Sequence, residues 1–270
     1  MERSLGLICG AGVLPALMAG QARRDGWRVV AFAFPGAADL DAHADLVIPS
    51  RVGELAPVLA ALQAQKVESV AFSGKFWMSD LLRAQAPDAV HARMVTEAGS
   101  LVDANMTAVV VATLSSLGIT LLDQRTLLGE DVSGVGCWSR RQPTQAEWTD
   151  IRRGFAVARA LADASVGQTV VLKDGAVSAV EAMEGTSEAI RRGTALSGPG
   201  AVVVKCVARA HDYRFDIPTV GTETIEAAAA GGAQAVAVEA GCVFVLDRRA
   251  TARRADDAGI ALVSTDGSGG

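Results

Sequence analysis

The sequence contains few aromatic residues: they make up 4% of its 270 positions, although half of all residues are hydrophobic. Its cores must therefore consist mainly of Ala, Val and Leu side chains. This composition favours parallel sheets covered by Ala-rich helices, because strands buried on both faces read as continuous apolar runs. The chain is also longer than the ~100–200 residues usual for one domain, so we expect two domains.

Cysteine is scarce as well, and its four positions are unrelated: Cys9, Cys137, Cys206 and Cys242. No two of them have the spacing of metal ligands, and a chain of this size does not need disulfide bonds to hold its fold. We therefore expect free thiols and a cytoplasmic protein. The three histidines are equally scattered, which argues against a zinc site.

Two further absences argue against nucleic-acid binding and against a transmembrane segment. The net charge is −5, and no basic cluster marks a face that would bind nucleic acid. No run of roughly 18 or more apolar residues is free of charges and turn residues, so we expect no transmembrane segment.

The first half of the chain alternates short apolar runs with segments of helical periodicity. Apolar runs that end in Gly or Pro predict strands, and apolar residues three and four positions apart predict helices. The strands are expected at 5–9, 28–34, 45–48, 69–72 and 119–122, and the helices at 13–25, 52–64 and within 91–117. This alternation specifies an α/β fold with helices on both faces of a parallel sheet. We therefore predict a Rossmann-like domain over residues 1–128.

The alternation stops at residues 129–144, where three glycines and a proline without periodicity indicate a linker. A second α/β domain is expected over 145–270. Its strands are predicted at 169–172, 176–181, 201–205, 235–239, 242–246 and 260–263, and its helices at 145–164, 222–230 and 248–258. Asp174-Gly175 predicts a hairpin, Ala240-Gly241 a tight turn, and Thr222 the N-cap of a helix.

The first candidate binding motif is Gly10-Ala11-Gly12, directly after the first strand. Small residues there let a phosphate or sugar approach the backbone, and the following helix start supplies N–H donors. Pro15 stands where a dinucleotide fingerprint would have its third glycine, and the second strand ends without an acid for a ribose hydroxyl. An NAD(P)-dependent oxidoreductase is therefore disfavoured. The alternative is a tight turn that binds no ligand.

A second motif, Gly74-Lys75, follows the fourth strand. The carboxyl ends of parallel strands share one edge of the sheet, so we expect this pair on the same edge as Gly10, with Lys75 able to meet a phosphate. The alternative is a solvated loop lysine.

A third motif lies where a strand turns into a helix, at Glu181, Glu184, Gly185 and Thr186. Carboxylates at the end of a strand suit Mg²⁺, a hard cation that prefers oxygen ligands. The alternative is helix capping, with Thr186 as the N-cap and the acids favouring the helix dipole.

The densest group of functional side chains is Lys205 followed by residues 211–221. In an extended segment Asp212, Arg214 and Asp216 point to one side, because alternate residues share a face. The guanidinium would hold phosphate oxygens, and a carboxylate would hold Mg²⁺ or orient water. The alternative is a network of surface ion pairs.

Three of these motifs together resemble the LpxI family, the UDP-2,3-diacylglucosamine pyrophosphatases of lipid A biosynthesis. The opening LGLICGAGVLP is similar to the family's LGLIAGxGxLP. EAMEGT at 181–186 matches EAxEGT, and RFDIPTVGTET at 214–224 matches RxDxPTxGxxT. The motifs keep the family's order along nearly the whole chain.

The resemblance implies two domains and a Mg²⁺-dependent hydrolase. Water would attack the α-phosphorus of UDP-2,3-diacylglucosamine, a lipid-linked nucleotide sugar, and give UMP and lipid X. The resemblance leaves room for a homo-oligomer and for peripheral contact with the inner membrane.

The resemblance assigns a role to Asp216, and the other expected site residues follow from the motifs described above. Asp216 is critical in the family motif; with Arg214 and Asp212 it forms the catalytic set, and with Glu181 it forms the metal-binding set. From the motifs, the expected substrate-binding residues are Gly10, Ala11, Gly12, Gly74, Lys75, Glu184, Gly185, Thr186, Lys205 and Thr219.

Several positions depart from the family pattern, among them Arg209 and His211, which replace a proline and a glutamine before the RxDxP motif. Ser187 and Ala104 stand where the family has acids, and Lys75 stands where the family has Asn. These departures leave a second hypothesis open: a non-catalytic relative that binds a nucleotide or an acyl-sugar.

Overall fold

The computed structural model describes residues 3–76, 87–99, 104–128 and 134–267. They fall into two compact units, each described here by itself. The first comprises Met1–Gly129 and Asp212–Ile217, and the second comprises Glu130–His211 and Pro218–Gly270. The short segment Asp212–Ile217 thus leaves the second unit and belongs to the first, although we had expected it in the C-terminal domain.

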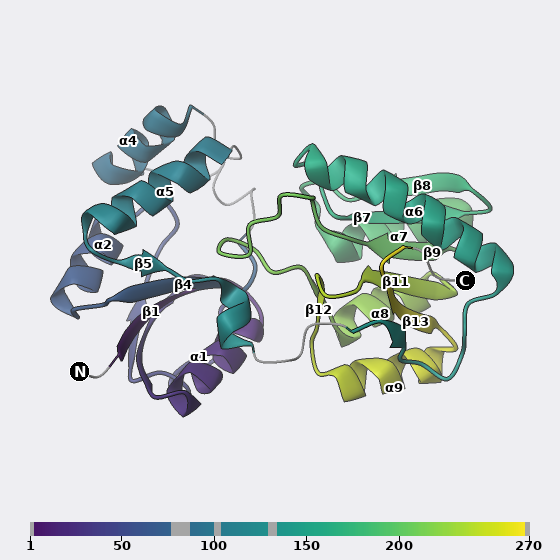
Figure 1. Cartoon of the computed structure of the whole chain (residues 1–270), viewed down its shortest axis with the longest axis horizontal. Helices are drawn as coiled ribbons and strands as arrows, with labels where there is room; N and C mark the ends of the chain where they lie inside the picture. The colour runs from purple at the N-terminus through teal and green to yellow at the C-terminus, as the bar shows by residue number, and fades with distance from the viewer. Residues whose placement is uncertain (1–2, 77–86, 100–103, 129–133, 268–270) are drawn as a thin grey trace. The chain divides into compact units, whose positions relative to one another are not determined.

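The first unit is built on the predicted parallel sheet (Figure 1). Its strands are β1 (Arg3–Cys9), β2 (Trp27–Ala33), β3 (Leu46–Pro49), β4 (Ser69–Ser73) and β5 (Thr120–Leu121). The order is β3-β2-β1-β4-β5, and every neighbouring pair is parallel. The chain winds outward from β1 to β3 and then crosses to the other side of β1. The winding direction therefore reverses between β1 and β4, and open α/β sheets bind ligands at such a point.

Helices cover both faces of this sheet, as predicted. They are α1 (Leu14–Arg24), α2 (Leu55–Ala64) and α5 (Ala104–Ser116), and α4 (Ala89–Ala98) packs on α2 and α5. Figure 1 shows α1 below the sheet and α2 and α5 above it. Phe32 packs in one cluster with Leu62 of α2 and Leu114 of α5. Gly6 permits this packing, because a Cβ there would lie 2.7 Å from Leu62 Cδ2.

The second unit has a six-stranded mixed sheet in the order β6-β13-β11-β9-β7-β8. The strands are β6 (Gly136–Cys137), β7 (Thr169–Lys173), β8 (Ala176–Val180), β9 (Val202–Lys205), β11 (Ala235–Glu239) and β13 (Ala261–Thr265). The three strands β9, β11 and β13 are parallel to one another, and β7 is antiparallel to both β8 and β9. The hairpin predicted at Asp174-Gly175 is confirmed; both residues have positive φ, as its turn type requires.

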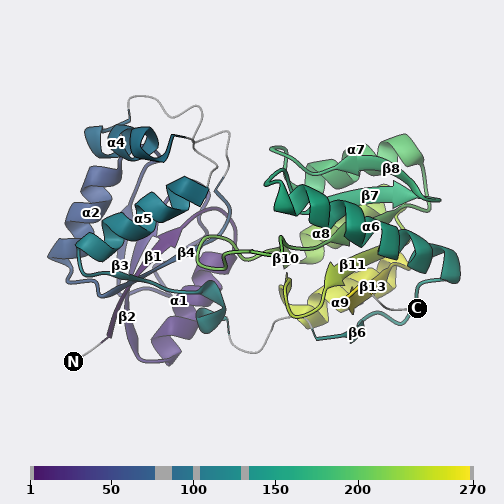
Figure 2. The same ribbon diagram turned by 45° about the horizontal axis from the view of Figure 1, so that its top comes forward.

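Alternate side chains of this sheet point to its two faces and pack into two separate hydrophobic cores. On one face α6 (Gln145–Asp163) packs through Ile151 and Phe155 against Leu172. On the other face lie α7 (Thr186–Ser197), α8 (Thr222–Ala230) and α9 (Arg248–Ala258) (Figure 2). Ile190 of α7, Ile225 of α8 and Ala255 of α9 belong to one buried cluster with Val171. The second unit is therefore three layers thick.

Several sequence-based details differ from the structure. The expected strand 242–246 is reduced to β12 (Phe244–Val245), which pairs with β10 (Thr219–Val220) in a separate two-stranded sheet. Residues 136–137 of the expected linker form β6, because they pair with the edge strand β13. The N-caps of α8 and α7 are Gly221 and Gly185, one residue before the threonines that we expected. No helix in the described ranges has the length and apolar character needed to cross a membrane.

None of the four cysteines forms a disulfide bond, as expected. Burial raises the pKa of the Cys9 thiol to about 12, and it raises the pKa of Cys206 to about 12 as well. Only the thiolate is nucleophilic, and with a pKa of about 12 its population at pH 8 is about 10⁻⁴ at either site.

We expect iodoacetamide at pH 8 to alkylate the partly exposed Cys242 and to spare Cys9 and Cys206 in the folded protein. Peptide mass spectrometry before and after unfolding in urea checks this; labelling of Cys9 in the folded chain at the rate of Cys242 would contradict it.

Candidate functional site

Two of the predicted binding loops meet where the winding of the first sheet reverses. The Gly10 amide donates to the carbonyl of Ser73 (2.8 Å), and Ala11 and Lys75 exchange two backbone hydrogen bonds of 2.8 and 2.9 Å. The approach is too close for side chains, because a Cβ on Gly74 would lie 2.8 Å from the carbonyl oxygen of Gly10. The loops after β1 and β4 therefore form one interlocked edge of the sheet.

The amides of the glycine turn serve the fold and not a ligand. The amides of Gly10 and Ala11 are used in the contacts above, and Gly12 donates to the carbonyl of Gly36 (3.1 Å). The N–H donors that we expected belong to the helix start after the turn, and these contacts do not involve them. Gly12 offers room instead: it has φ +96°, and a Cβ there would meet nothing within 4 Å.

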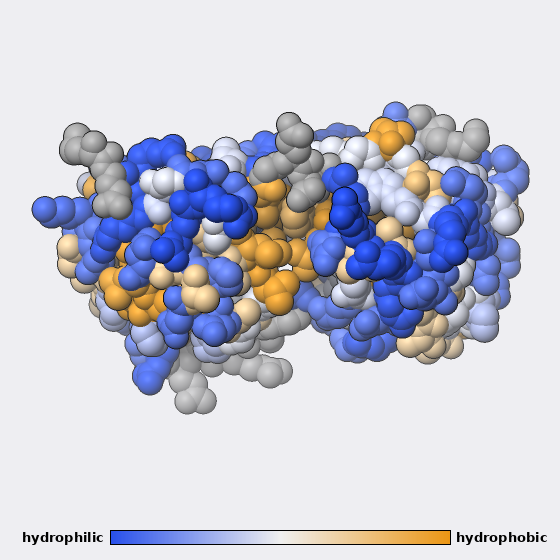
Figure 3. Space-filling view, turned by 90° about the horizontal axis from the view of Figure 1, so that it is seen from below, coloured by the Kyte–Doolittle hydropathy of each residue, from blue (hydrophilic) through white to orange (hydrophobic). Residues whose placement is uncertain are grey.

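Apolar side chains surround this edge of the sheet. Phe76 packs edge-on against Phe34 at 5.4 Å and against Phe72 at 6.4 Å between ring centroids. At the start of α1, the side chains of Val13 and Leu17 are about half exposed. Figure 3 views the molecule from below Figure 1, the side on which α1 lies, and shows apolar residues at the surface of that side. The edge thus combines room beside a glycine with exposed apolar surface.

The segment Asp212–Ile217 is anchored at the same edge. The ring of Phe215 stacks on Phe72 with centroids 5.5 Å apart, and the amide of Gln124 donates to the carbonyl of Tyr213 (3.0 Å). Since Phe72 contacts Phe76, and a Cβ on Gly10 would touch the Phe76 ring, the segment is connected to the glycine turn through packed side chains. Residues distant in sequence are therefore brought together at one edge.

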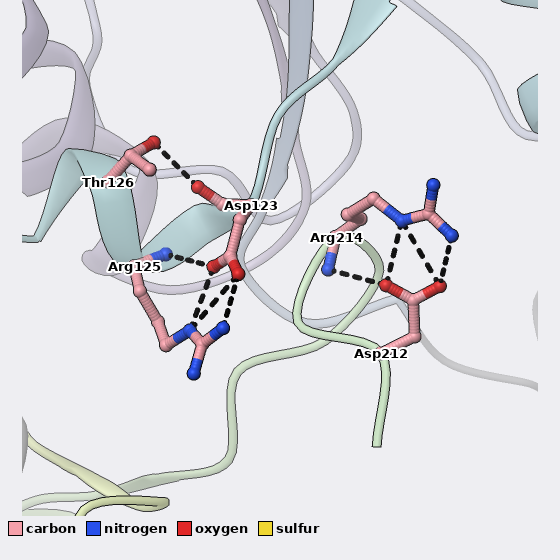
Figure 4. A network of polar contacts seen from close by, with 5 residues as sticks. All are labelled: Asp123, Arg125, Thr126, Asp212 and Arg214. Atoms are coloured by element: carbon pink, nitrogen blue, oxygen red, sulfur yellow. Dashed lines mark hydrogen bonds and ion pairs between the residues drawn. The ribbon is translucent and has the colours of Figure 1, made fainter. Parts of the chain in front are cut away.

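The segment forms a turn, and our prediction of an extended backbone was wrong. The amide of Phe215 donates to the carbonyl of Asp212 (3.2 Å), and the Asp212 carboxylate accepts from the amide of Arg214 (3.0 Å). Asp side chains often bond the backbone two residues on, and this bond overrides the alternation of an extended strand. The carboxylate also takes Nε and Nη2 of Arg214 (Figure 4). This hydrogen bond raises the pKa of the Arg214 guanidinium, and Asp216 is exposed beyond the turn.

Sequence reasoning missed a second pair of the same kind, Asp123 and Arg125, just after β5. The Asp123 carboxylate accepts from the amide of Arg125 (2.9 Å) and from its Nε (3.0 Å). The side-chain hydrogen bond from Arg125 lowers the pKa of Asp123, and the negative charge of the nearby Asp212 opposes that shift. Asp-x-Arg occurs with identical spacing at 123–125 and 212–214, but it also occurs at 150–152 and 247–249, so the spacing alone does not single out this pair.

Glu181, Thr186 and Lys205, three further predicted residues, form a separate group in the second unit. Lys205, at the end of β9, is buried and donates from Nζ to Thr186 Oγ1 (2.9 Å). The Thr186 hydroxyl in turn donates to Glu181 Oε1 (2.8 Å). Gly185 precedes them with φ +82°, a conformation that suits glycine, and starts α7. Glu181, Thr186 and Lys205 are therefore linked by a short chain of hydrogen bonds.

Three other predicted positions have different surroundings. Glu184 forms an ion pair with Arg192. Thr219 lies in β10. Ser187, at one of the departures from the family pattern, donates to Glu223 Oε1 (3.1 Å). The departure at Ala104 concerns a side chain outside the described residues.

The described residues hold no preformed cluster of three metal-binding side chains. The two predicted ligands belong to different units, and Glu181 already accepts hydrogen bonds from Thr186 and from the amide of Gln168. Mg²⁺ commonly uses only one or two carboxylates and takes its other ligands from water and substrate phosphates. The exposed carboxylate of Asp216 fits that kind of site.

Comparison with known proteins agrees with the order of the two units along the chain. Residues 4–130 match the family model described as the LpxI N-terminal domain, and residues 134–263 match the LpxI C-terminal domain. The chain is similar to the UDP-2,3-diacylglucosamine pyrophosphatase LpxI of Caulobacter vibrioides. The two are 30% identical over 280 residues, which cover 98% of each chain.

Proposed function

The chain belongs to the LpxI family, and from this we propose that it hydrolyses the diphosphate of UDP-2,3-diacylglucosamine to UMP and lipid X. Water would attack the α-phosphorus. The observation that carries the proposal is the anchoring of Asp212–Ile217 at the edge of the first sheet, in packed contact with the glycine turn. It gathers charged groups suited to a phosphate where open α/β sheets bind ligands.

We propose a separate task for each of the three charged residues of the turn. Arg214 keeps its positive charge at every working pH and neutralises charge on the phosphoryl group. Asp212 fixes the direction of that guanidinium through its bidentate bond. Asp216, exposed beside this pair, orients the attacking water and accepts its proton.

We propose Mg²⁺ as the cofactor, with Asp216 as the residue that holds it and with water and substrate phosphates as its other ligands. The support is the chemistry of the donors, because carboxylate oxygen suits a hard cation. When bound, Mg²⁺ would neutralise charge on the transferring phosphoryl group.

The other binding residues divide between the two units. In the second unit the buried ammonium of Lys205, oriented by Thr186, supplies positive charge for a phosphate. In the first unit Gly12 gives room, and the exposed side chains of Val13 and Leu17 suit the acyl chains of a lipid-linked substrate. A cytoplasmic location, peripheral contact with the inner membrane and a homo-oligomeric state are part of the same proposal.

We expect the purified protein to release UMP from UDP-2,3-diacylglucosamine in the presence of Mg²⁺, and to stop when EDTA removes the metal. Chromatographic measurement of UMP checks this. A non-catalytic relative is the second candidate, because Ser187 carries no charge at a position where the family has an acid. That candidate gains if the protein binds the substrate tightly and yet releases no UMP.

A further inference from the structure

The first unit contains two Asp-x-Arg turns of the same construction. In each, the carboxylate accepts from the amide of the arginine two residues later and from Nε and Nη2 of its guanidinium. Figure 4 shows both turns in one view. A carboxylate that binds the backbone and the side chain of one arginine leaves its guanidinium few orientations. Both guanidiniums are therefore preorganised.

The two turns are attached to each other although they lie far apart in the sequence. The amide of Gln124, inside the first turn, donates to the carbonyl of Tyr213, inside the second (3.0 Å). The guanidinium of Arg125 lies over the Tyr213 ring, 3.9 Å from its centroid. The middle residue of each turn thus contacts the other turn, and the two form a single structure after the carboxyl end of β5.

The charges of the two turns also act on one another. The hydrogen bond to Asp212 raises the pKa of Arg214, and the negative charge of Asp123 raises it further. The hydrogen bond from Arg125 lowers the pKa of Asp123, and the negative charge of Asp212 opposes that shift. The guanidinium side chains are 44% exposed at Arg125 and 40% exposed at Arg214, so a ligand can reach both. Alternating carboxylates and guanidiniums that are fixed and yet accessible suit a ligand with several phosphate oxygens.

We infer that Arg125 is a second diphosphate-binding residue of this site, held by Asp123 and placed by Tyr213 so that it acts together with Arg214. The inference rests on the proposed function, because it takes the ligand to be the diphosphate of a nucleotide sugar. Asp123 is then a positioning residue, since it acts through the arginine that it holds.

The test measures binding of UDP, UMP and uridine by calorimetry in Mg²⁺ buffer, with wild type and Arg125→Gln. We expect Arg125→Gln to weaken UDP binding roughly tenfold or more, as loss of a charge-assisted bidentate contact would, to weaken UMP less, and to leave uridine unchanged. Arg125→Lys keeps the charge without the planar fork and should recover only part of the loss.

Arg23→Gln is the matched control. Arg23 is 45% exposed, pairs with Asp45 at 3.5 Å and lies in the last turn of α1, away from the carboxyl ends of the strands. Circular dichroism of each variant confirms that it is folded. If Arg125→Gln binds UDP as the wild type does, or weakens it no more than Arg23→Gln does, the inference is wrong and the proposed function stands. If the wild type itself neither binds UDP nor releases UMP, both are wrong.

Discussion

Asp216→Ala is expected to lower the rate of UMP release by roughly 10²-fold or more, the loss typical of a group that acts at the transition state. Other contacts hold the chain around Asp216, because Phe215 stacks on Phe72 and its amide donates to the carbonyl of Asp212. Asp216 is exposed, so its removal leaves the cores intact. Binding of UDP should therefore survive, and the variant should retain uncleaved substrate.

The measurement compares UMP release and UDP affinity for the wild type, Asp216→Ala and Asp216→Asn. Asp257→Ala is the control, since Asp257 is an exposed carboxylate on α9. Asp216→Asn keeps the shape of the side chain and removes its negative charge, so it should be nearly as slow as Asp216→Ala. A rate for Asp216→Ala that equals the wild-type rate would overturn the catalytic assignment.

The elements that could be predicted from the sequence are those with strong local signals at their ends. Helix α9 was predicted at 248–258 and is found there, because the Asp247 side chain caps its first turn and Gly259 ends it in a left-handed conformation. Strands of apolar residues between turn residues were found for the same reason. The two-residue strand β6 was missed, and β12 was predicted too long. Both strands pair with residues distant in the sequence, and such pairing leaves no periodic pattern.

The site was predictable only in part. The glycine turn and Gly74-Lys75 were expected on one edge, because parallel strands share their carboxyl ends. The turn at Asp212 was expected to be extended, since the alternation rule takes no account of a carboxylate that bonds its own backbone. This segment belongs to the first unit because Phe215 packs on Phe72, and no local sequence pattern predicts a contact between such distant residues. Asp123 and Arg125 became visible only after that contact was known.

Gly74→Ala is expected to destabilise the first unit by about 2–5 kcal/mol and to abolish most of the activity. Gly74 has φ +81°, and a methyl group there would lie 2.8 Å from the backbone of Gly10 and Ala11. A left-handed conformation costs an L-residue about 1–2 kcal/mol, and forcing extra atoms into a packed contact costs about 1–3 kcal/mol more. The contact joins the loops after β1 and β4, so relief of the clash must separate the two loops that form the edge.

Gly118→Ala separates the two contributions. Gly118 lies in the same unit with φ +73°, but a Cβ there would meet nothing within 4 Å. This control should therefore lose only the conformational term, about 1–2 kcal/mol, and keep its activity. Urea unfolding followed by fluorescence, together with UMP release, measures both quantities. Equal destabilisation by the two substitutions, with activity retained in Gly74→Ala, would mean that the loops move apart without cost and that their close contact does not shape the binding edge.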